Sequence, residues 1–241
     1  MKILFYNLLI LLFFNYSIFS QDQTSDSLIK EDNNKKEMNT ESTDNDNIEE
    51  NKVVNVPKNG WELYQEGRYY DSIIYLRAEM RRFPQRINIY VILGWDYRQL
   101  RRYKEMEDIS FEGLKIIPSD IRLIRNLGES YYFQNKFLNA VKEFEKYISY
   151  RYDKNDSYLP TIYYYLGVCF YNLKSFRKAD IAISTARYYN PDDKNINLYL
   201  GKIKFELKQF EKAEKSFNDV LKNFPNNTDA IEGLKRIKDF Q

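Results

Sequence analysis

The chain has 241 residues, of which 43% are apolar and 17% aromatic, and its formal net charge is only +2. Histidine is absent and the single cysteine is Cys169, which excludes Ser-His and Cys-His catalytic dyads, an intrachain disulfide and a thiolate metal cluster. With only eight glycines and six prolines, the composition favours long helices over a turn-rich all-β fold.

Residues 1–20 have the pattern of a secretory signal peptide. Lys2 is followed by an apolar run from Ile3 to Phe14, and a short polar stretch ends at Ser20. This order predicts export with cleavage after Ser20. The alternative is an uncleaved anchor, because residues 3–19 are nearly long enough to span a thinned bilayer. We therefore expect a periplasmic or cell-envelope protein, held at the inner membrane through its N-terminus if the signal is retained.

The next segment, residues 21–52, is predicted to be an acidic disordered linker. Residues 21–56 contain ten acidic and four basic side chains and very few apolar ones. Such a composition buries too little apolar surface to offset the entropy of ordering. Residues 57–241 carry 32 basic and 25 acidic residues, a net charge of +7. A solvated spacer is therefore one interpretation, and an acidic tail that docks on the basic body or on a partner is the other.

A period of about 34 residues runs through the rest of the chain. Glycines recur in steps of 34, 34, 39 and 34 at Gly60, Gly94, Gly128, Gly167 and Gly201. Nine residues after each glycine stands an aromatic residue: Tyr69, Tyr103, Phe137, Phe176 and Phe210. Twelve residues after each stand Ser72, Met106, Ala140, Ala179 and Ala213. This register predicts pairs of helices, with a break at Gln134–Lys136 inside one such pair.

The pattern resembles the tetratricopeptide repeat (TPR) family over residues 53–240. The Leu-Gly pair of that motif reads Leu93-Gly94, Leu127-Gly128, Leu166-Gly167 and Leu200-Gly201, whereas the first unit departs with Asn59-Gly60. The resemblance implies an all-α, right-handed superhelical α-solenoid of five helix–turn–helix units with a C-terminal capping helix. The expected units are 53–86, 87–120, 121–159, 160–193 and 194–227, followed by the cap at 228–241.

Two packing predictions follow from this register. Glycine on the first helix of a unit leaves room where the two helices cross, so Gly128 is predicted to be a packing notch with Ala140 as its opposite wall. In the capping helix, Ile231, Leu234 and Ile237 are predicted to face the last repeat. Cys169 is predicted to be a buried, small apolar residue.

The family resemblance also implies a binding face. Stacked repeats curve so that their first helices line an inner, concave surface. Tryptophan, tyrosine and arginine are the side chains that dominate binding energy at interfaces. The candidate partner-binding residues on that face are Trp61, Tyr64, Trp95, Arg98, Arg122, Arg125, Tyr132, Tyr164, Tyr171 and Phe205. The alternative is that these rings only fill space between successive helices.

We therefore expect a non-catalytic scaffold or adaptor of the bacterial cell envelope that binds a protein or peptide and uses no cofactor or metal. The alternatives are a membrane-tethered structural linker in an envelope assembly, or an accessory factor for cell-wall or outer-membrane biogenesis. No nucleic-acid motif is present. A basic cluster is interpreted as a solvated face or as a contact for an acidic partner; it comprises Arg77, Arg81, Arg82, Arg86, Arg98, Arg101, Arg102 and Lys104.

Overall fold

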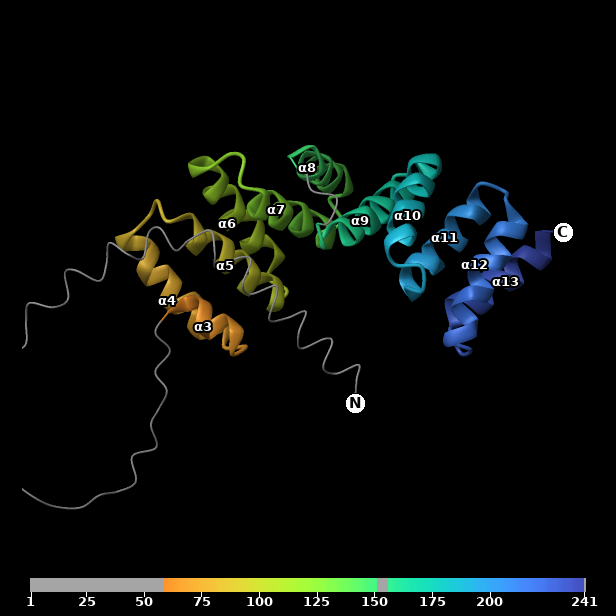
Figure 1. Cartoon of the computed structure of the whole chain (residues 1–241), viewed down its shortest axis with the longest axis horizontal. Coiled ribbons are helices and arrows are strands. Elements are labelled where there is room, and N and C mark those ends of the chain that lie inside the picture. The colour runs from red at the N-terminus through yellow and green to blue at the C-terminus, as the bar shows by residue number, and fades with distance from the viewer. Residues whose placement is uncertain (1–58, 151–155, 241) are drawn as a thin grey trace, which may run out of the picture. The chain divides into compact units, whose positions relative to one another are not determined.

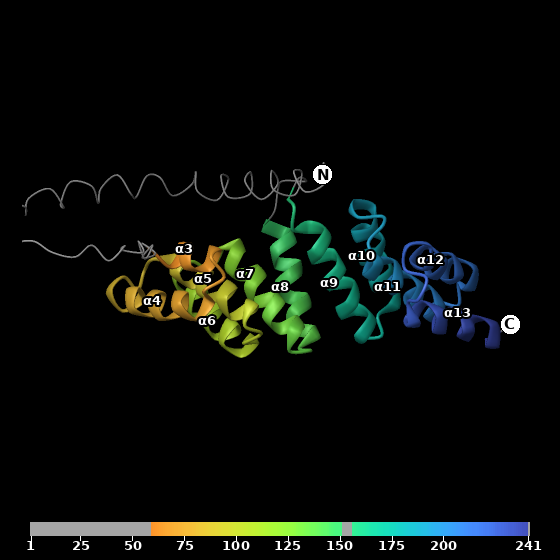
Figure 2. The ribbon, with the colours of Figure 1, turned by 90° about the horizontal axis from the view of Figure 1, so that it is seen from below.

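A computed structural model of the chain describes residues 59–150 and 156–240. These residues form eleven α-helices and no strand. The predicted signal peptide and the whole predicted linker, residues 21–52, lie outside the described residues. Figure 1 shows the helices following one another in chain order from α3 to α13, and Figure 2 shows the same row from below.

The helices form five antiparallel pairs and a final single helix, which confirms the predicted all-α solenoid class. The first members, here called the A helices, are α3 (Gly60–Gln65), α5 (Ile87–Gln99), α7 (Ile121–Phe133), α9 (Leu159–Asn172) and α11 (Lys194–Glu206). The second members, the B helices, are α4 (Tyr69–Arg82), α6 (Tyr103–Ile116), α8 (Phe137–Tyr150), α10 (Phe176–Tyr189) and α12 (Phe210–Asn223). The chain ends in α13 (Thr228–Phe240).

Each A helix joins its B helix through a three-residue turn of one geometry. The middle residue has a left-handed φ near +60° to +75° and is Gly67, Arg101, Asn135, Lys174 or Lys208. The amide of the third residue then donates back to a carbonyl of the A helix, as Lys136 does to Tyr131 at 2.9 Å. This is the reversed bond that closes a helix C-terminus. The predicted break at residues 134–136 is one of these turns.

The glycine register is confirmed as a series of packing notches, but the predicted wall is wrong. A Cβ on Gly128 would lie 2.7 Å from Cε1 of Phe144, and one on Gly201 would lie 2.6 Å from Cε1 of Phe217. At these two glycines the facing residue is sixteen positions further along, which for Gly128 is one helical turn beyond Ala140, whereas Gly94 faces Asn126 of the next A helix at 2.5 Å. Which B-helix residue meets the glycine depends on where the two helices cross, and here that point lies one turn further from the connecting turn than predicted. Ala140 is nevertheless completely buried.

The long step between the third and fourth glycines lies in the connection from α8 to α9. This connection covers residues 151–158, whereas 117–120 and 190–193 join the neighbouring pairs, and α9 is also one residue longer than α11. The connection is therefore four residues longer than its neighbours, and α9 adds one more residue. Together these five residues lengthen the glycine spacing from 34 to 39. Asp156 anchors the end of the connection, because its carboxylate accepts a hydrogen bond of 2.6 Å from the Tyr147 hydroxyl.

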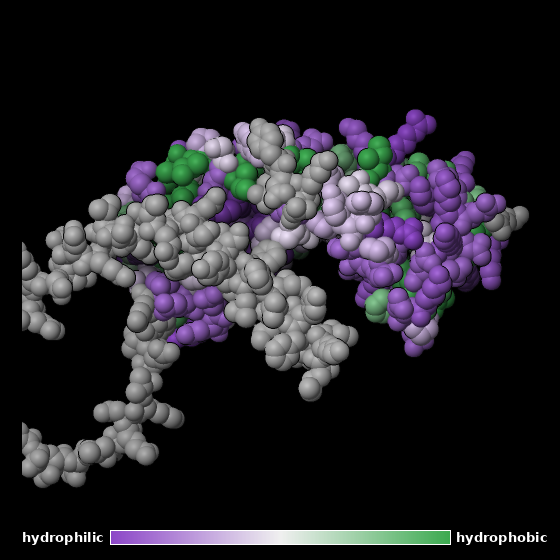
Figure 3. Space-filling model, in the orientation of Figure 1, coloured by the Kyte–Doolittle hydropathy of each residue, from purple (hydrophilic) through white to green (hydrophobic). Residues whose placement is uncertain are grey.

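The last helix, α13, closes the row with a polar outer side. Ala230, Gly233 and Ile237 are buried, whereas Ile231 is 48% exposed, so the prediction that Ile231 faces the last repeat is wrong. Gly233 takes the inward position instead, because a Cβ there would lie 2.5 Å from Cε2 and Cζ of Phe217. In the face seen in Figure 3, hydrophilic residues cover most of α11 to α13.

Candidate partner-binding face

The A helices form the more closely packed side of the row. Neighbouring A helices touch in the pairs α3–α5, α5–α7 and α9–α11, and α11 touches α13, whereas no two B helices of the described residues contact each other to a comparable extent. Closer spacing on one side of a stack makes that side the inner one. The ten candidate residues all lie on A helices, and we call their surface the A-helix face.

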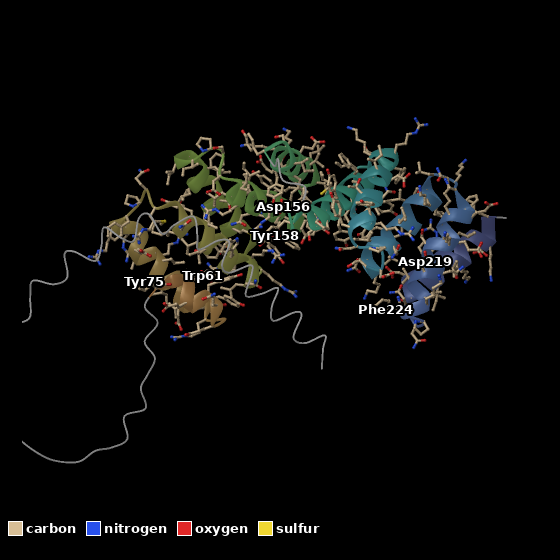
Figure 4. All side chains as sticks on the ribbon, in the orientation of Figure 1. Trp61, Tyr75, Asp156, Tyr158, Asp219 and Phe224 are labelled. Carbon is tan, nitrogen blue, oxygen red and sulfur yellow. The ribbon has the colours of Figure 1, made fainter. Side chains whose placement is uncertain are left out.

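The N-terminal end of this face is a cluster of rings, here called the tryptophan cluster. Trp61 stacks on Tyr64 with ring centroids 5.5 Å apart, and Trp95 from the next A helix lies 5.9 Å from Trp61 and 5.7 Å from Tyr64. All three side chains are partly exposed, and Figure 4 labels Trp61 on α3. The Trp95 indole Nε1 is buried with no hydrogen-bond partner in the described residues. The cluster therefore offers flat apolar area, while its unpaired indole N–H lies below the surface.

The middle of the face carries charge. Arg98 on α5 lies 2.6 Å from Glu129 on α7, and Arg125 lies 3.9 Å from the other oxygen of the same carboxylate. Arg125 is buried and its guanidinium sits 3.7 Å above the ring of Tyr158, a residue labelled beside α9 in Figure 4. The pKa of Arg98 is raised, because burial opposes its charge but the Glu129 carboxylate and other neighbours outweigh that effect.

Arg122, another candidate residue, forms hydrogen bonds to nearby polar side chains. Its guanidinium donates to Asp120 at 2.7 Å and to Asn88 at 2.8 Å. Asp120 is also the N-cap of α7 and accepts from the backbone amides of Arg122 and Leu123. The structure therefore does not bring Arg122 and Arg125 together on a shared ligand position.

The C-terminal half of the face is a run of tyrosines. Tyr132 lies 4.3 Å from Tyr165, and Tyr199 lies 5.8 Å from both Tyr164 and Tyr171, centroid to centroid. Burial raises the pKa of the Tyr132, Tyr164 and Tyr199 hydroxyls above the ordinary value. These hydroxyls therefore stay neutral at physiological pH and serve as hydrogen-bonding groups on an otherwise apolar surface.

Phe205 closes the face beside a pocket of about 250 Å³. The Phe205 ring is buried under Arg236 of α13, whose guanidinium lies 4.3 Å from the ring centroid. Lys202 and Asp229 line the same pocket and pair with each other at 2.9 Å. The pocket is therefore lined by aromatic rings and by charged side chains, of which Lys202 and Asp229 form an ion pair.

Four residues of this face were missed by sequence reasoning. They are Tyr158, Tyr165, Tyr199 and Arg236. Tyr165 and Tyr199 share one signal, since both stand two residues before a register glycine. Tyr158 lies in the lengthened connection and Arg236 in the cap, where the repeat register gives no guide.

The residues of the predicted basic cluster are spread over α4, α5, α6 and the connections between these helices. Arg77 donates to the Tyr97 hydroxyl at 3.1 Å, Arg102 pairs with Glu105 at 2.8 Å, and Lys104 pairs with Asp108 at 2.8 Å. Pairs of this kind on a wet surface contribute little to stability. The carboxylate partners of Arg102 and Lys104 offset part of the positive charge of the cluster, whereas the neutral Tyr97 hydroxyl offsets none of it.

The described residues hold no group of three or more histidine, cysteine, aspartate or glutamate side chains placed to bind a metal ion. Cys169 is fully buried, and burial raises the pKa of its thiol to about 12. Within residues 59–150 and 156–240, no helix is both long and apolar enough to cross a membrane.

Comparisons with known proteins agree with this architecture. Residues 197–227 match the family model described as tetratricopeptide repeat. A chain of the APC/C hetero-tetramer Cut9-Hcn1 is similar over 74% of this chain at 19% identity with a TM-score of 0.63, and this chain spans 35% of its length. YrrB, described as a TPR protein with an unusual peptide-binding site, is similar over 68% of this chain and 82% of its own at 14% identity, with a TM-score of 0.60. PilF of Pseudomonas aeruginosa gives a TM-score of 0.60 at 14% identity, over 75% of this chain and 80% of its own. No curated protein matches the sequence.

The helix pairs, with the ring-lined A-helix face on one side, form an α-solenoid. Residues 197–227 match the tetratricopeptide repeat model, and the fold of the described helix pairs is similar to that of a solved protein described as a TPR protein.

Proposed function

We propose that this protein is a non-catalytic adaptor of the bacterial cell envelope that binds an extended peptide or a helix of a partner on its A-helix face. The observation that carries the proposal is a pair of partly exposed ring groups on one face, the tryptophan cluster at its N-terminal end and the tyrosines from Tyr132 to Tyr199 in its C-terminal half. Rings supply large contact area at a small loss of conformational entropy. YrrB, which shares the fold at 14% identity, is described as having a peptide-binding site.

The envelope location is supported by the sequence of residues 1–20 alone, whose basic start and short apolar centre are typical of an export signal. If that segment remains attached, the protein is a membrane-tethered linker in an envelope assembly, which is the alternative function. A role as an accessory factor in cell-wall or outer-membrane biogenesis is compatible with either form. Mass spectrometry of the native protein distinguishes cleavage after Ser20 from retention.

The binding face is tested by crosslinked co-purification from the native cell. The double variant Trp61→Ala/Trp95→Ala removes the tryptophan cluster and is expected to lose its partner. The matched control is Tyr70→Ala/Tyr188→Ala, which removes two rings from B helices that are 64% and 82% exposed. Far-UV circular dichroism checks that both variants keep their helices. Retention of every partner by the tryptophan variant would show that binding occurs elsewhere.

A further inference from the structure

The first helix of the row, α3, has few contacts that keep it in place. It spans only Gly60–Gln65, and of these six residues only Gly60 and Leu63 are buried. A helix of this length is not stable on its own in water, so α3 persists only while it packs on α4 and α5. It nevertheless carries Trp61 and Tyr64, two of the three rings of the tryptophan cluster. The contacts that keep α3 docked therefore also keep the N-terminal end of the A-helix face assembled.

Three buried oxygen atoms link α3 to the two helices on which it packs. The Ser72 hydroxyl oxygen of α4 lies 3.0 Å from the Gly60 carbonyl oxygen of α3 and 2.7 Å from Oδ2 of Asp96 on α5. A hydroxyl has a single hydrogen to donate. Ser72 can therefore donate to the Gly60 carbonyl only if the Asp96 carboxyl supplies the hydrogen between Asp96 and Ser72. The link from α5 through α4 to α3 is complete only when Asp96 is protonated.

The surroundings of Asp96 favour the protonated form. Its side chain is fully buried, and its other oxygen, Oδ1, has no hydrogen-bond partner within the part of the chain that the structure describes. A buried, ionised carboxylate with an unpaired oxygen is costly. Burial raises the pKa of Asp96 to about 7, and the hydrogen bond from Ser72 opposes this shift.

No neighbouring helix supplies a charge that would stabilise an ionised Asp96. The titratable group of α3 that acts on Asp96 is the Tyr64 hydroxyl, which is neutral near pH 7 because burial raises its pKa. The buried residues of α6 are all uncharged. The charged side chains of α4 and α7 do not shift the pKa of Asp96. On these two helices, Arg77 donates to the Tyr97 hydroxyl and Glu129 pairs with Arg98.

We propose that the proton on Asp96 keeps α3, and with it Trp61 and Tyr64, docked on α4 and α5. When Asp96 ionises, the Ser72 hydrogen turns to the carboxylate, the Gly60 carbonyl loses that donor, and undocking of α3 lets water reach the charge. The docked state holds the proton more tightly than the undocked state, so docking is strongest at acidic pH and weakens as the pH rises toward 7. The inference rests on the proposed function, because it describes how binding at the tryptophan cluster is regulated.

The test is hydrogen exchange of the full chain at pH 5 and pH 7, read by mass spectrometry and corrected for the intrinsic exchange rate at each pH. With a pKa of about 7 in the docked state and 3.8 in the undocked state, the opening equilibrium constant of α3 should be about 50-fold larger at pH 7. The reporter is the segment 63–68, whose amides donate to carbonyls of α3 and its N-cap, as Glu66 does to Glu62 at 3.0 Å. The amides of α13, at the other end of the row in Figure 1, should show no such rise.

Two variants assign the effect to Asp96. Asp96→Asn keeps the shape, can donate to Ser72 through its amide and cannot ionise, so α3 should open equally at both pH values. The matched control is Asp71→Asn, because Asp71 lies on α4 beside Ser72 but its side chain is 50% exposed. This control should keep the rise seen in the wild type. Far-UV circular dichroism checks that both variants keep their helices.

Equal opening of α3 at the two pH values in the wild type, or a rise that persists in Asp96→Asn, would overturn the inference while leaving the proposed function standing. A rise of the same size in α13 would overturn it as well, because the opening would then be global. Failure of the proposed function itself is seen separately, when the tryptophan variant keeps every crosslinked partner.

Discussion

Replacing Asp96 with asparagine is expected to stabilise the protein increasingly as the pH rises from 4 to 8. Asp96 is completely buried, and its Oδ2 lies 2.7 Å from the Ser72 hydroxyl oxygen. That hydroxyl oxygen is also 3.0 Å from the Gly60 carbonyl oxygen. One hydroxyl hydrogen cannot serve both acceptors. A protonated Asp96 resolves this by donating to Ser72, which then donates to Gly60 and ties α5, α4 and α3 together.

The magnitude follows from the pKa of Asp96, which burial raises to about 7 from 3.8 although the Ser72 hydrogen bond opposes the shift. The native state therefore holds this proton more tightly than the unfolded chain. The protonated Asp96 therefore contributes its full share to the free energy of unfolding below about pH 4, and this contribution is lost as the pH rises through 7. For a pKa that rises from 3.8 to about 7, the contribution amounts to about 4 kcal/mol. The polar groups near Asp96 on neighbouring helices are the Tyr64 hydroxyl of α3 and the Ser72 hydroxyl of α4. Arg77 of α4 donates its hydrogen bond to the Tyr97 hydroxyl. No lysine or arginine of the described residues forms an ion pair with Asp96.

The assay is urea unfolding followed by circular dichroism at each pH unit from 4 to 8. Asp96→Asn keeps the shape and can donate to Ser72, so its advantage over the wild type should grow from near zero to about 4 kcal/mol. The exposed Asp192→Asn is the control and should follow the wild type at every pH. A difference between wild type and Asp96→Asn that stays constant over this range would refute a buried, protonated Asp96.

Two further predictions concern packing. Gly128→Leu should destabilise the protein by about 1–3 kcal/mol through overpacking, since even a Cβ would lie 2.7 Å from the Phe144 ring. Adding Phe144→Ala should recover part of that loss, and an unchanged urea midpoint for Gly128→Leu would contradict the notch. The Cys169 thiol, fully buried and with its pKa raised by burial to about 12, should react with a thiol reagent at pH 8 only as fast as the protein opens. Rapid labelling of the folded protein would show that the thiol is accessible.

Much of the fold could be predicted because the repeat register is a property of the chain itself. A glycine every 34 residues and an aromatic residue nine positions later located the helix pairs and the turn at Asn135. Which residue faces each glycine could not be predicted, because that depends on where two helices cross. The ring of Phe144 occupies the position expected for Ala140, and Gly233 takes the inward position expected for Ile231.

The candidate face was predictable as a set of positions but not as a set of contacts. The register placed Trp61, Trp95 and Arg98 on A helices, and the structure brings these tryptophans to 5.9 Å from each other. Nothing in the sequence indicated that Arg125 would be buried against Tyr158, since Tyr158 belongs to the lengthened connection before α9.

The sequence by itself indicated the number of helix pairs, the turns within them and ten candidate positions on the A helices, because each depends on spacing along one chain. It did not indicate Tyr158, Tyr165, Tyr199 or Arg236. Only the tertiary structure decided which charges are neutralised and which are not. Arg98 reaches Glu129 across 31 positions, and Ser72 reaches Asp96 across 24. Such contacts are fixed by the angle and spacing at which successive helices stack, and these in turn depend on the volumes of side chains packed between the helices.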